Sequence, residues 1–513
     1  MQNFLSRYHD RITSVLSGFD RVVFRGTLRE LAHVNGLMAF LAYKRVLLTG
    51  FGQYAESMTK DIKTSVEQWA ESLGRPVHYV QSSRVAKEDI ARMYLESDGI
   101  REGLVCVLNC VEPCQTFEIH RSREKKLLEL RSRERKCLHH YAYFLDPDFG
   151  FMHVRLQTWL PFTARVCING REWLACQMDK RGMRYRRADN CFLWIEEPEK
   201  AQALVQELLK TDWSKQLDSF LFRVHHAHAE LFRDDRMDYY WSTHQAEWAT
   251  DVLFQTPAFL AKIYPQLTRH AMLHFQSPDV LRFLGKRLTS NFTGEVTSDY
   301  KRRPEGVRVK HRVKTNSVKM YDKQESVLRI ETTINDPRDF RVFRAPEGQP
   351  EAEKSWRPMR KGVADLHRLT EISQRANETY LEALSTVEVD DTLIDLIEPL
   401  TKPTTIDGRR FRALQPFGID ADAFRAINRG EFLLNGFRNR DLVNILYPRC
   451  AGPEERRRAQ GRVTRLLRLL RAHHVIKKVP RTHRYQLTEG GQQVIAAVLA
   501  ANETSVKQLL AAA

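Results

Sequence analysis

The sequence predicts an α+β multidomain protein, and three observations support that class. Its 513 residues are more than one hydrophobic core usually contains, so two to four domains are expected. With 42% hydrophobic and 28% charged residues, the chain has enough apolar material to fold. Strand-like and helix-like segments alternate along it. We expect an N-terminal α/β unit, an antiparallel sheet, a helical middle, a second, basic β block and a basic C-terminal domain.

The net charge indicates a polyanionic partner. Lys and Arg number 81 and Asp and Glu 64, which leaves +17 at pH 7. No segment approaches the roughly 18 consecutive apolar residues that a membrane-spanning helix needs. The first residues also lack the apolar region of a secretory signal. We therefore expect a cytoplasmic protein that binds nucleic acid and does not enter a membrane.

The first 197 residues are expected to form one body. Three strand patterns alternate with helix patterns, as in residues 20–28 and 58–73, which predicts an α/β unit over residues 1–115. Paired strand patterns separated by charged or turn-forming segments then predict an antiparallel sheet region over residues 116–197.

The middle of the chain is expected to be helical, because residues 198–290 contain few Gly or Pro and repeat apolar positions at helical spacing. On a helix, His244 and Glu247 would share one face, but no recognised zinc motif is present. A strand-rich basic block over residues 291–345 and a connector over residues 346–416 lead to a domain over residues 417–513.

Three cysteines have a spacing that invites a metal interpretation. Cys106, Cys110 and Cys114 lie four residues apart within a strongly apolar segment. That segment is typical of a buried strand, in which Cys behaves as a small apolar residue. We expect buried, reduced thiols there, and the sequence shows no motif for a cofactor.

The cations are concentrated near the carboxyl end. Residues 421–500 contain sixteen Lys or Arg and six Asp or Glu, a balance of +10. Residues 456–484 contain eleven cations and no carboxylate. On a helix over residues 461–474, Val463, Leu466, Leu467 and Leu470 form an apolar stripe, because 3.6 residues per turn brings these positions together. The arginines then lie on the opposite side.

The segments after this helix complete a known order. Residues 475–488 read as two short strands joined by a basic tip, and Thr488 is placed to cap a final helix. An earlier helix begins at Asn439 or nearby. A helix, an Arg-rich helix, a hairpin and a helix is the order of a winged helix-turn-helix.

The stretch LLRAHHVIKKVPRTHRYQLTEGG resembles the winged-helix domains of bacterial regulators. The resemblance implies a recognition helix in the major groove of duplex DNA, with the wing on the backbone or minor groove, and it leaves a homodimer open. A protein-interaction role for the same domain is the alternative. The residues expected to contact DNA are Arg462, Arg465, Arg468, Arg471, Lys477, Lys478, Arg481, His483 and Arg484.

The second β block has its own basic pattern. Cations alternate with apolar residues along it, so one face of a strand would be basic and the other buried. Beside Tyr321, such a face could hold single-stranded nucleic acid by stacking and phosphate contacts. Its cations are Arg308, Lys310, Arg312, Lys314, Lys319 and Lys323.

The segments KMYDK and LRIET within residues 308–334 resemble a hairpin of the replication initiators of plasmids and filamentous phages. The resemblance makes Tyr321 a candidate nicking residue. Those enzymes also carry a YxxK nucleophile motif and a metal-binding His-x-His triplet with a bulky hydrophobic centre, and neither is recognised in this sequence.

Metal-dependent cleavage would need carboxylates that hold Mg²⁺ or Mn²⁺. The candidates are Asp20, Glu112, Glu118 and Glu331, and they would have to converge in a basic cleft. ATP-driven, nicotinamide-dependent and serine-hydrolase classes lose support, because their motifs are absent from the sequence.

These patterns predict a bacterial DNA-binding protein with a C-terminal winged helix that processes DNA, in the manner of a mobile-element replication initiator or transposase. A non-enzymatic winged-helix regulator and an RNA-binding protein that uses the basic sheet remain the alternatives. Whether the protein is an enzyme is left open by the sequence.

Overall fold

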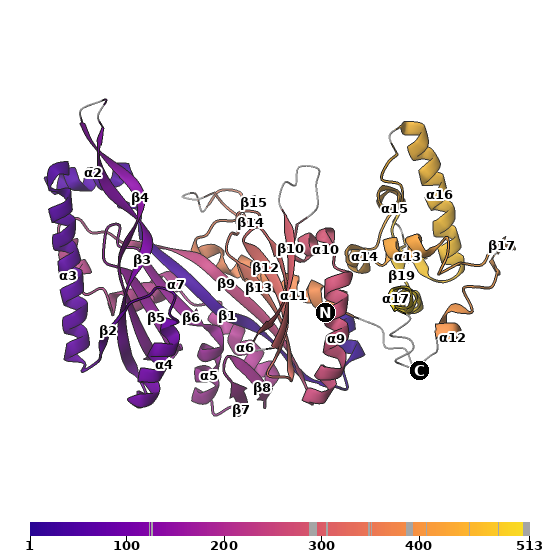
Figure 1. Ribbon diagram of the computed structural model, residues 1–513, viewed down its shortest axis with the longest axis horizontal. Helices are drawn as coiled ribbons and strands as arrows, with labels where there is room; N and C mark the ends of the chain where they lie inside the picture. Colours follow the sequence, from indigo (N-terminus) through magenta and orange to yellow (C-terminus); the bar gives the residue numbers. More distant parts are fainter. Residues whose placement is uncertain are drawn as a thin grey trace.

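The computed structural model shows a mixed α/β protein built on one large sheet (Figure 1). The structure describes residues 1–122, 124, 127–286, 295–303, 306–346, 349, 351–385, 393–406, 408–450, 452–480 and 482–505. The sheet has eleven strands, in the order β10 (Val296–Arg303), β11 (Gly306–Val313), β12 (Asn316–Lys323), β13 (Val327–Ile334), β9 (Tyr239–Phe254), β1 (Ile12–Leu28), β6 (Ala164–Asn169), β5 (Gly150–Gln157), β4 (Leu127–Asp146), β3 (Gly103–Ser122) and β2 (Val77–Val80).

The two strand-rich regions that we expected as separate blocks belong to this one sheet. β1 pairs with β6 on one side and with β9 on the other, and β9 pairs in turn with β13. All pairings are antiparallel except that of β2 with β3, which is parallel. The expectation of a second β block apart from the first sheet is therefore wrong. The apolar alternation of each region shows that it forms strands but does not show which strands pair.

The region expected to be mostly helical, residues 198–290, does contain several helices, but one long strand that the sequence did not indicate, β9, also runs through it. Its sequence, YYWSTHQAEWATDVLF, is rich in the aromatic and β-branched residues that fit a pleated sheet. The strand is central and mostly buried, so it lacks a clear alternation of polar and apolar positions. His244 and Glu247 consequently lie on a strand, and the helical spacing argument for them does not apply.

Helices cover the sheet and surround its two main cores. At the β10–β13 end, α9, α10 and α11 pack against one face, and at the other end α2, α3, α7 and neighbouring helices do so. Their bounds are α1 (Gln2–Arg7), α2 (Val34–Tyr43), α3 (Phe51–Ser72), α4 (Lys87–Ser97), α5 (Gly170–Lys180), α6 (Pro198–Leu208), α7 (Trp213–Phe222), α8 (His228–Leu231), α9 (Pro257–Leu273), α10 (Ser277–Phe283) and α11 (Leu366–Ala383), with short 3₁₀ turns η1 (Leu48–Gly50) and η2 (Val363–Asp365).

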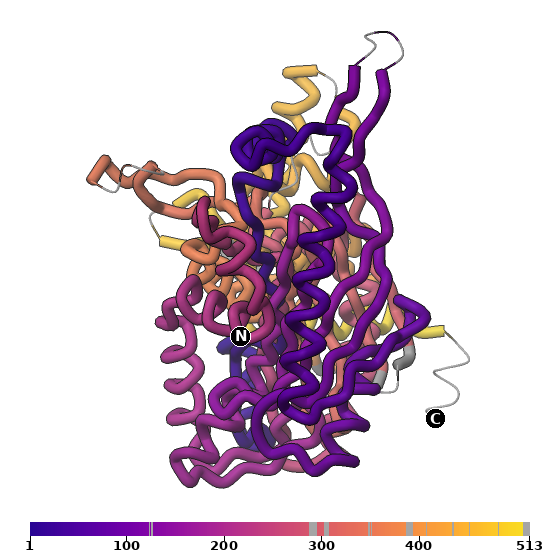
Figure 2. Tube along the Cα trace, turned by 90° about the vertical axis from the view of Figure 1, so that its left-hand side faces the viewer, coloured from indigo at the N-terminus to yellow at the C-terminus, as the bar shows by residue number. Residues whose placement is uncertain are grey.

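Several smaller parts surround the sheet. Two two-stranded ribbons of the described chain lie beside it, β7 (Tyr185–Ala188) with β8 (Cys191–Ile195) and β14 (Arg341–Arg344) with β15 (Ser355–Pro358). A third, β16 (Thr404–Ile406) with β17 (Arg409–Phe411), belongs to the C-terminal part together with β18 (Ile476–Lys478) and β19 (Tyr485–Leu487). β3 and β4 extend beyond the neighbouring strands as a long hairpin, whose end projects from the body (Figure 2).

The C-terminal part has a hydrophobic core of its own, formed within residues 396–499. In Figure 1 it lies at the right-hand side, beyond α9 and α11. Its elements are α12 (Leu393–Ile397), α13 (Ala421–Ile427), α14 (Gly430–Asn435), α15 (Asn439–Leu446), α16 (Pro453–Ala472), β18 (Ile476–Lys478), β19 (Tyr485–Leu487) and α17 (Glu489–Glu503).

The separate core predicts that the C-terminal part can be destabilised alone. Leu470 is fully buried in it, and Leu470→Ala should reduce the free energy of unfolding of this part by about 2–5 kcal/mol, because the variant leaves a cavity. Hydrogen exchange should then accelerate in α13–α17, while the amides of β1 and β9 keep their protection. Leu267→Ala, in the core under α9, is the matched control. It should accelerate hydrogen exchange in α9 and β9, while the amides of α13–α17 keep their protection. Equal acceleration in both parts for both variants would contradict independent cores.

Candidate nucleic-acid interface

α16 presents a row of exposed arginines. The side chains of Arg462, Arg465, Arg468 and Arg471 are all exposed, whereas Val463, Leu467 and Leu470 are buried in the C-terminal core. Arg462 lies over the ring of Tyr447, 5.9 Å from its centroid. Within the described part of the chain, Arg465, Arg468 and Arg471 have no hydrogen-bond or ion-pair partner. The helix therefore carries positive charge that the protein itself does not neutralise.

The local sequence explains where this helix begins. Pro453 occupies its first turn, where the missing backbone N–H costs nothing, and Glu454 and Glu455 lie at the positive end of the helix dipole. α16 thus starts eight residues before the segment expected to be helical from the arginine pattern. Its last residue is Ala472, and a short connection leads to β18.

The expected ribbon and its cap are present after α16. β18 pairs with β19, and Thr488 Oγ1 accepts a hydrogen bond of 2.9 Å from the Gly491 amide at the start of α17. Lys477, Lys478 and His483 are exposed, and Arg484 is half-buried. Arg481 lies outside the described residues.

The segment that contains Phe437 also pairs with this ribbon, at β19. Phe437 and Tyr485 exchange two backbone hydrogen bonds of 2.8 Å each. The preceding Gly436 has a φ of +60°, and a Cβ there would lie 2.2 Å from the Tyr485 carbonyl oxygen. Only glycine permits this approach, so the crossing of the chain past β19 is fixed by that position.

A groove separates the C-terminal part from α10 and α11, with a volume of about 1390 Å³. Cations from both sides line it, more of them than carboxylates. They are Arg282, Lys286, Arg341, Arg368 and Arg375 from the body and Arg438, Arg440 and Arg484 from the C-terminal part, against Asp339, Glu378, Glu382, Glu431 and Asp441.

The body side of the groove has free cations and exposed rings. Arg341 and Arg375 are exposed, and their side chains have no hydrogen-bond or ion-pair partner among the residues that the structure describes. Trp356 lines the groove and is 54% exposed, and its ring centroid lies 5.6 Å from that of Phe343, an equally exposed residue of the β14–β15 ribbon that does not line the groove. Arg368 lies over Trp356, 5.4 Å from the ring centroid. This combination of cations and aromatic rings is typical of nucleic-acid contacts.

The predicted basic face of the second β block is only partly free. Arg312 and Lys314 are exposed, but Lys314 lies in a turn after β11 and pairs with Asp339. Arg308 and Lys310 are half-buried, and Arg308 Nη2 lies 3.7 Å from Asp299.

Lys319 and Lys323 are neither exposed nor free. Lys319 Nζ lies 2.5 Å from Glu331, and Lys323 Nζ lies 3.1 Å from Asp189 and contacts Asn190. Together with Arg308 and Lys314, four of the six predicted cations therefore pair with carboxylates within the protein. The sequence alternation correctly placed these lysines on one face but could not show that acidic residues of other strands lie beside it.

The centre of the sheet contains a buried ion-pair network around Arg329. This side chain is fully buried on β13, and its guanidinium donates to Asp251 of β9 at 2.5 and 2.8 Å and to Asp20 of β1 at 3.0 Å. Arg171 of α5 lies 3.0 Å from Asp251. Burial alone would raise the pKa of Asp251, but the two guanidinium groups lower it. For Asp20, burial dominates and raises the pKa.

Glu331 extends this network toward β12. Its carboxylate accepts hydrogen bonds of 2.5 Å from Lys319 Nζ and from the Tyr321 hydroxyl. Burial opposes ionisation of Glu331, yet Lys319 and Tyr321 lower its pKa to about 2. Burial and the neighbouring Glu331 charge raise the pKa of Tyr321 well above its ordinary value. A phenol in this state is a poor nucleophile, so the geometry gives no support to Tyr321 as a nicking residue.

The four candidate carboxylates do not converge. Asp20 and Glu331 belong to the Arg329 network, where cations and a hydroxyl contact their oxygens. Glu112 lies on β3, six strands from β13, with Lys87 at 2.9 Å and Arg155 at 3.1 Å, and its pKa is about 2, because these cations and Tyr141 outweigh its burial. Glu118 pairs with Arg133 at 2.7 Å. The expected cleft of converging carboxylates is therefore not formed by these residues.

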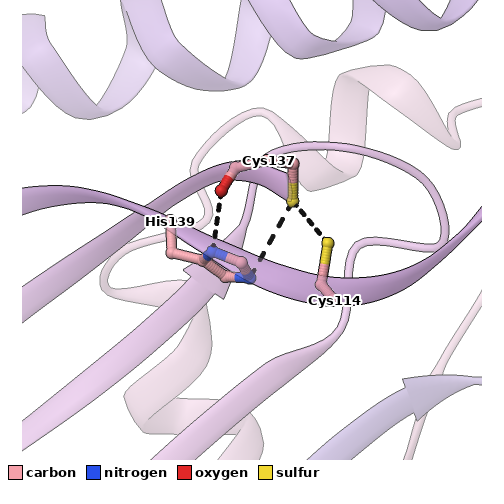
Figure 3. Close-up of side chains that lie close together, drawn as sticks. All are labelled: Cys114, Cys137 and His139. Carbon is pink, nitrogen blue, oxygen red and sulfur yellow. Dashed lines mark hydrogen bonds between the residues drawn. The ribbon is translucent and has the colours of Figure 1, made fainter. Parts of the chain in front are cut away.

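A cluster of two thiols and an imidazole lies on β3 and β4 (Figure 3). Cys114 Sγ is 2.7 Å from Cys137 Sγ, and His139 Nε2 is 3.9 Å from Cys137 Sγ. Among the described residues, this is the only group of three or more such side chains with donor atoms close enough for one metal ion. Burial and nearby Arg155 lower the pKa of His139 to about 3, so its ring is neutral at pH 7.

The sequence spacing grouped Cys114 with two cysteines that do not lie in its cluster. Cys106 and Cys110 are buried thiols, as expected, but they take no part in the cluster. Cys137 and His139 were missed because their relation to Cys114 depends on the pairing of β3 with β4. A Cys-x-His pair on a strand, which places both side chains on one face, was the available signal.

Asp251 and Arg171 were missed for a similar reason. Both lie in segments without an acidic or basic pattern, and their burial depends on contacts between distant segments. Charged residues are seldom fully buried, so their positions in the sequence carried no sign of this role.

Comparison with protein-family models, with curated proteins and with solved structures finds no match to this chain. Among the described residues, no helix combines the length and the apolar character needed to cross a membrane. The candidate site must therefore be interpreted from its own geometry.

The low pKa of Glu331 predicts how its contribution to stability varies with pH. Because the folded pKa of about 2 lies below the unfolded value of about 4.3, this carboxylate stabilises the fold fully above that value, and its contribution falls as the pH drops toward 2. Glu331→Gln should therefore lower the free energy of unfolding strongly at pH 7 and progressively less between pH 5 and 2. Urea unfolding at several pH values measures this difference. The exposed Glu207→Gln is the control, and a pH-independent difference for Glu331→Gln would contradict the ion pairing.

Proposed function

We propose that this protein binds duplex DNA through a winged-helix domain formed by α13–α17, with α16 as the recognition helix. The observation that carries the proposal is the row of exposed arginines on α16, of which Arg465, Arg468 and Arg471 have no partner within the described residues. Clustered positive charge without internal neutralisation is the electrostatic footprint of a protein that binds nucleic acid.

The order and pairing of the elements support the winged-helix interpretation. α15 packs against α16, α16 leads directly into the β18–β19 ribbon, and Phe437 adds a backbone pair to the outer side of β19. A helix of this kind, about 10–12 Å wide with its side chains, fits the major groove, which is about 12 Å wide. The ribbon would then lie beside the DNA, where Lys477, Lys478 and His483 are exposed.

The groove beside α10 and α11 extends the proposed interface onto the body. Arg438, Arg440 and Arg484 line it from the C-terminal domain, and Arg341 and Arg375 line it from the other side. Phosphate contacts of this kind position a protein on DNA without reading its sequence. DNA held by the winged helix would therefore also be held against the body.

The proposal covers binding and not cleavage. The candidate carboxylates Asp20, Glu112, Glu118 and Glu331 are separated or neutralised by cations, and the Tyr321 hydroxyl donates a hydrogen bond to Glu331. DNA processing and a link with mobile elements remain predictions from sequence. Preference for RNA or single strands is the competing reading, favoured by the exposed Trp356 and Phe343, and the experiments below distinguish it.

Removing two of the free arginines should weaken binding through phosphate contacts. For Arg465→Ala with Arg468→Ala in the full-length protein, we expect duplex affinity to fall at least about tenfold and the slope of log K against log salt to become shallower by about 2. Fluorescence anisotropy with a labelled duplex at several salt concentrations measures both quantities.

The matched control replaces two arginines on the body, Arg184 and Arg236, which are 78% and 89% exposed in their side chains. Their replacement by alanine should leave both quantities nearly unchanged, which separates local contacts from total charge. Equal losses for the two double variants, or tighter binding of single-stranded RNA than of duplex DNA by the native protein, would contradict the proposal.

The groove can be tested separately by reversing one charge. Arg375→Glu should weaken duplex binding and remove hydroxyl-radical protection from the part of the DNA that lies outside the winged-helix footprint, because it places a carboxylate in the groove. Arg184→Glu is the control on a distant surface. An unchanged footprint for Arg375→Glu would exclude the groove from the interface while leaving the α16 contacts in place.

A further inference from the structure

We propose that Cys114, Cys137 and His139 form a zinc site at the base of the β3–β4 hairpin. This inference is independent of the proposed DNA binding. It rests on three donor atoms of the types that Zn²⁺ prefers, which lie within 4.8 Å of one another and come from two adjacent strands (Figure 3).

The pairing of β3 with β4 brings the donors together. Cys137 lies directly opposite Glu112, so Cys114, two residues further along β3, projects from the same face beside it. His139 follows Cys137 by two residues on β4 and therefore also faces the same way. The backbone thus places all three side chains on one side of the sheet.

The hydrogen bond of the imidazole leaves the correct nitrogen for a metal. His139 Nδ1 lies 3.1 Å from the Cys137 carbonyl oxygen, which can only accept a hydrogen bond. The proton must then be on Nδ1, and Nε2, the nitrogen that faces the thiols, keeps its lone pair. Histidine ligands of metal sites are commonly oriented by such a bond to a backbone carbonyl.

The sulfur–sulfur distance lies between that of a disulfide and that of a zinc site, and the strand register argues against the disulfide. The two sulfur atoms are 2.7 Å apart, beyond the roughly 2.04 Å of a disulfide bond and short of the roughly 3.8 Å between two thiolates bound to a tetrahedral Zn²⁺, so zinc binding requires the two thiols to separate. The two cysteines are diagonal neighbours in the strand register, an arrangement with a Cα separation of about 7–8 Å, whereas disulfides usually need less than about 6.8 Å. A disulfide would also give no role to the His139 nitrogen that faces the sulfur atoms.

The charges and the surroundings are compatible with a divalent cation. Two thiolates would neutralise Zn²⁺, and the charge of nearby Arg155 is already paired with Glu112. His139 and Cys114 are buried, which protects metal–ligand bonds from competing water. Since no fourth side chain of a suitable type joins the group within the described residues, water would complete a tetrahedral site.

The position of the site suggests what it stabilises. Beyond Cys114 and Cys137, β3 and β4 continue as a hairpin whose lower part packs into the main core through Phe117 and Leu130 and whose end projects from the body (Figure 2). Among the described residues of the hairpin, the exposed cations are Arg121, Arg131, Arg133, Arg135 and Lys136. A metal that bridges both strands at the base would fix the direction of this basic arm relative to the sheet.

Metal content and cobalt substitution test the site in the full-length protein. Protein purified under reducing conditions should contain stoichiometric zinc by elemental analysis, and Co²⁺ exchanged into it should give thiolate-to-cobalt absorption in the near ultraviolet. Cys114→Ser and His139→Asn should each reduce the zinc content and the cobalt signal. Cys176→Ser, which replaces a half-buried thiol on α5 outside the cluster, should keep both.

A second measurement does not depend on the folding of variants. In the native protein, added Zn²⁺ should slow alkylation of Cys114 and Cys137, read by peptide mass spectrometry, and leave Cys176 unaffected. Absence of both zinc and a cobalt signal in well-folded protein would overturn the proposal. Recovery of Cys114 and Cys137 as a linked peptide before reduction, under otherwise reducing purification, would replace the metal site by a disulfide.

Discussion

The ion pairs of Arg329 hold the centre of the sheet together. This one guanidinium connects β13 to β9 through Asp251 and to β1 through Asp20, and Arg171 attaches α5 to the same carboxylate. The segments involved are far apart in the sequence, so the contact joins the first strand of the chain to its second strand-rich region. Charges taken out of water destabilise a fold unless they are paired with good geometry, and here each charge has close partners. The register of the three strands is consequently tied to a specific set of side chains.

The same constraint explains why Asp20 and Glu331 form no open site for a cation. Carboxylates that could bind a metal are occupied by lysine and arginine, and the hydroxyl of Tyr321 is occupied by Glu331. A sequence can show that Asp20 and Glu331 lie in strands, but their partners belong to other strands. Asp20 is paired with Arg329 and Glu331 with Lys319, while Glu112 and Glu118 lie at the far end of the sheet. The predicted metal site is not formed because the order of the strands keeps these carboxylates apart, although their residue type could bind a metal.

Local structure was predictable where one segment contained its own signal. The apolar stripe and arginines of α16, the β18–β19 ribbon and the Thr488 cap all follow from short patterns and are present. The misassigned segment was β9, whose buried position removes the polar alternation that usually marks a strand. The groove could not be predicted either. Arg375 and Arg438 line it from two distant parts of the chain, and no sequence pattern indicates that these parts lie next to each other.

The position of β9 has a consequence for synthesis on the ribosome. β1 emerges first and can pair with β6 once residue 169 is made, but its other edge waits for β9, which ends at residue 254. At 5–20 residues per second, those 85 residues correspond to roughly 4–17 s. During that interval a strand of seventeen residues has an unpaired edge, the kind of surface on which nascent chains associate wrongly. We therefore expect nascent chains that end before residue 254, in which β1 lacks its partner β9, to depend most on chaperones.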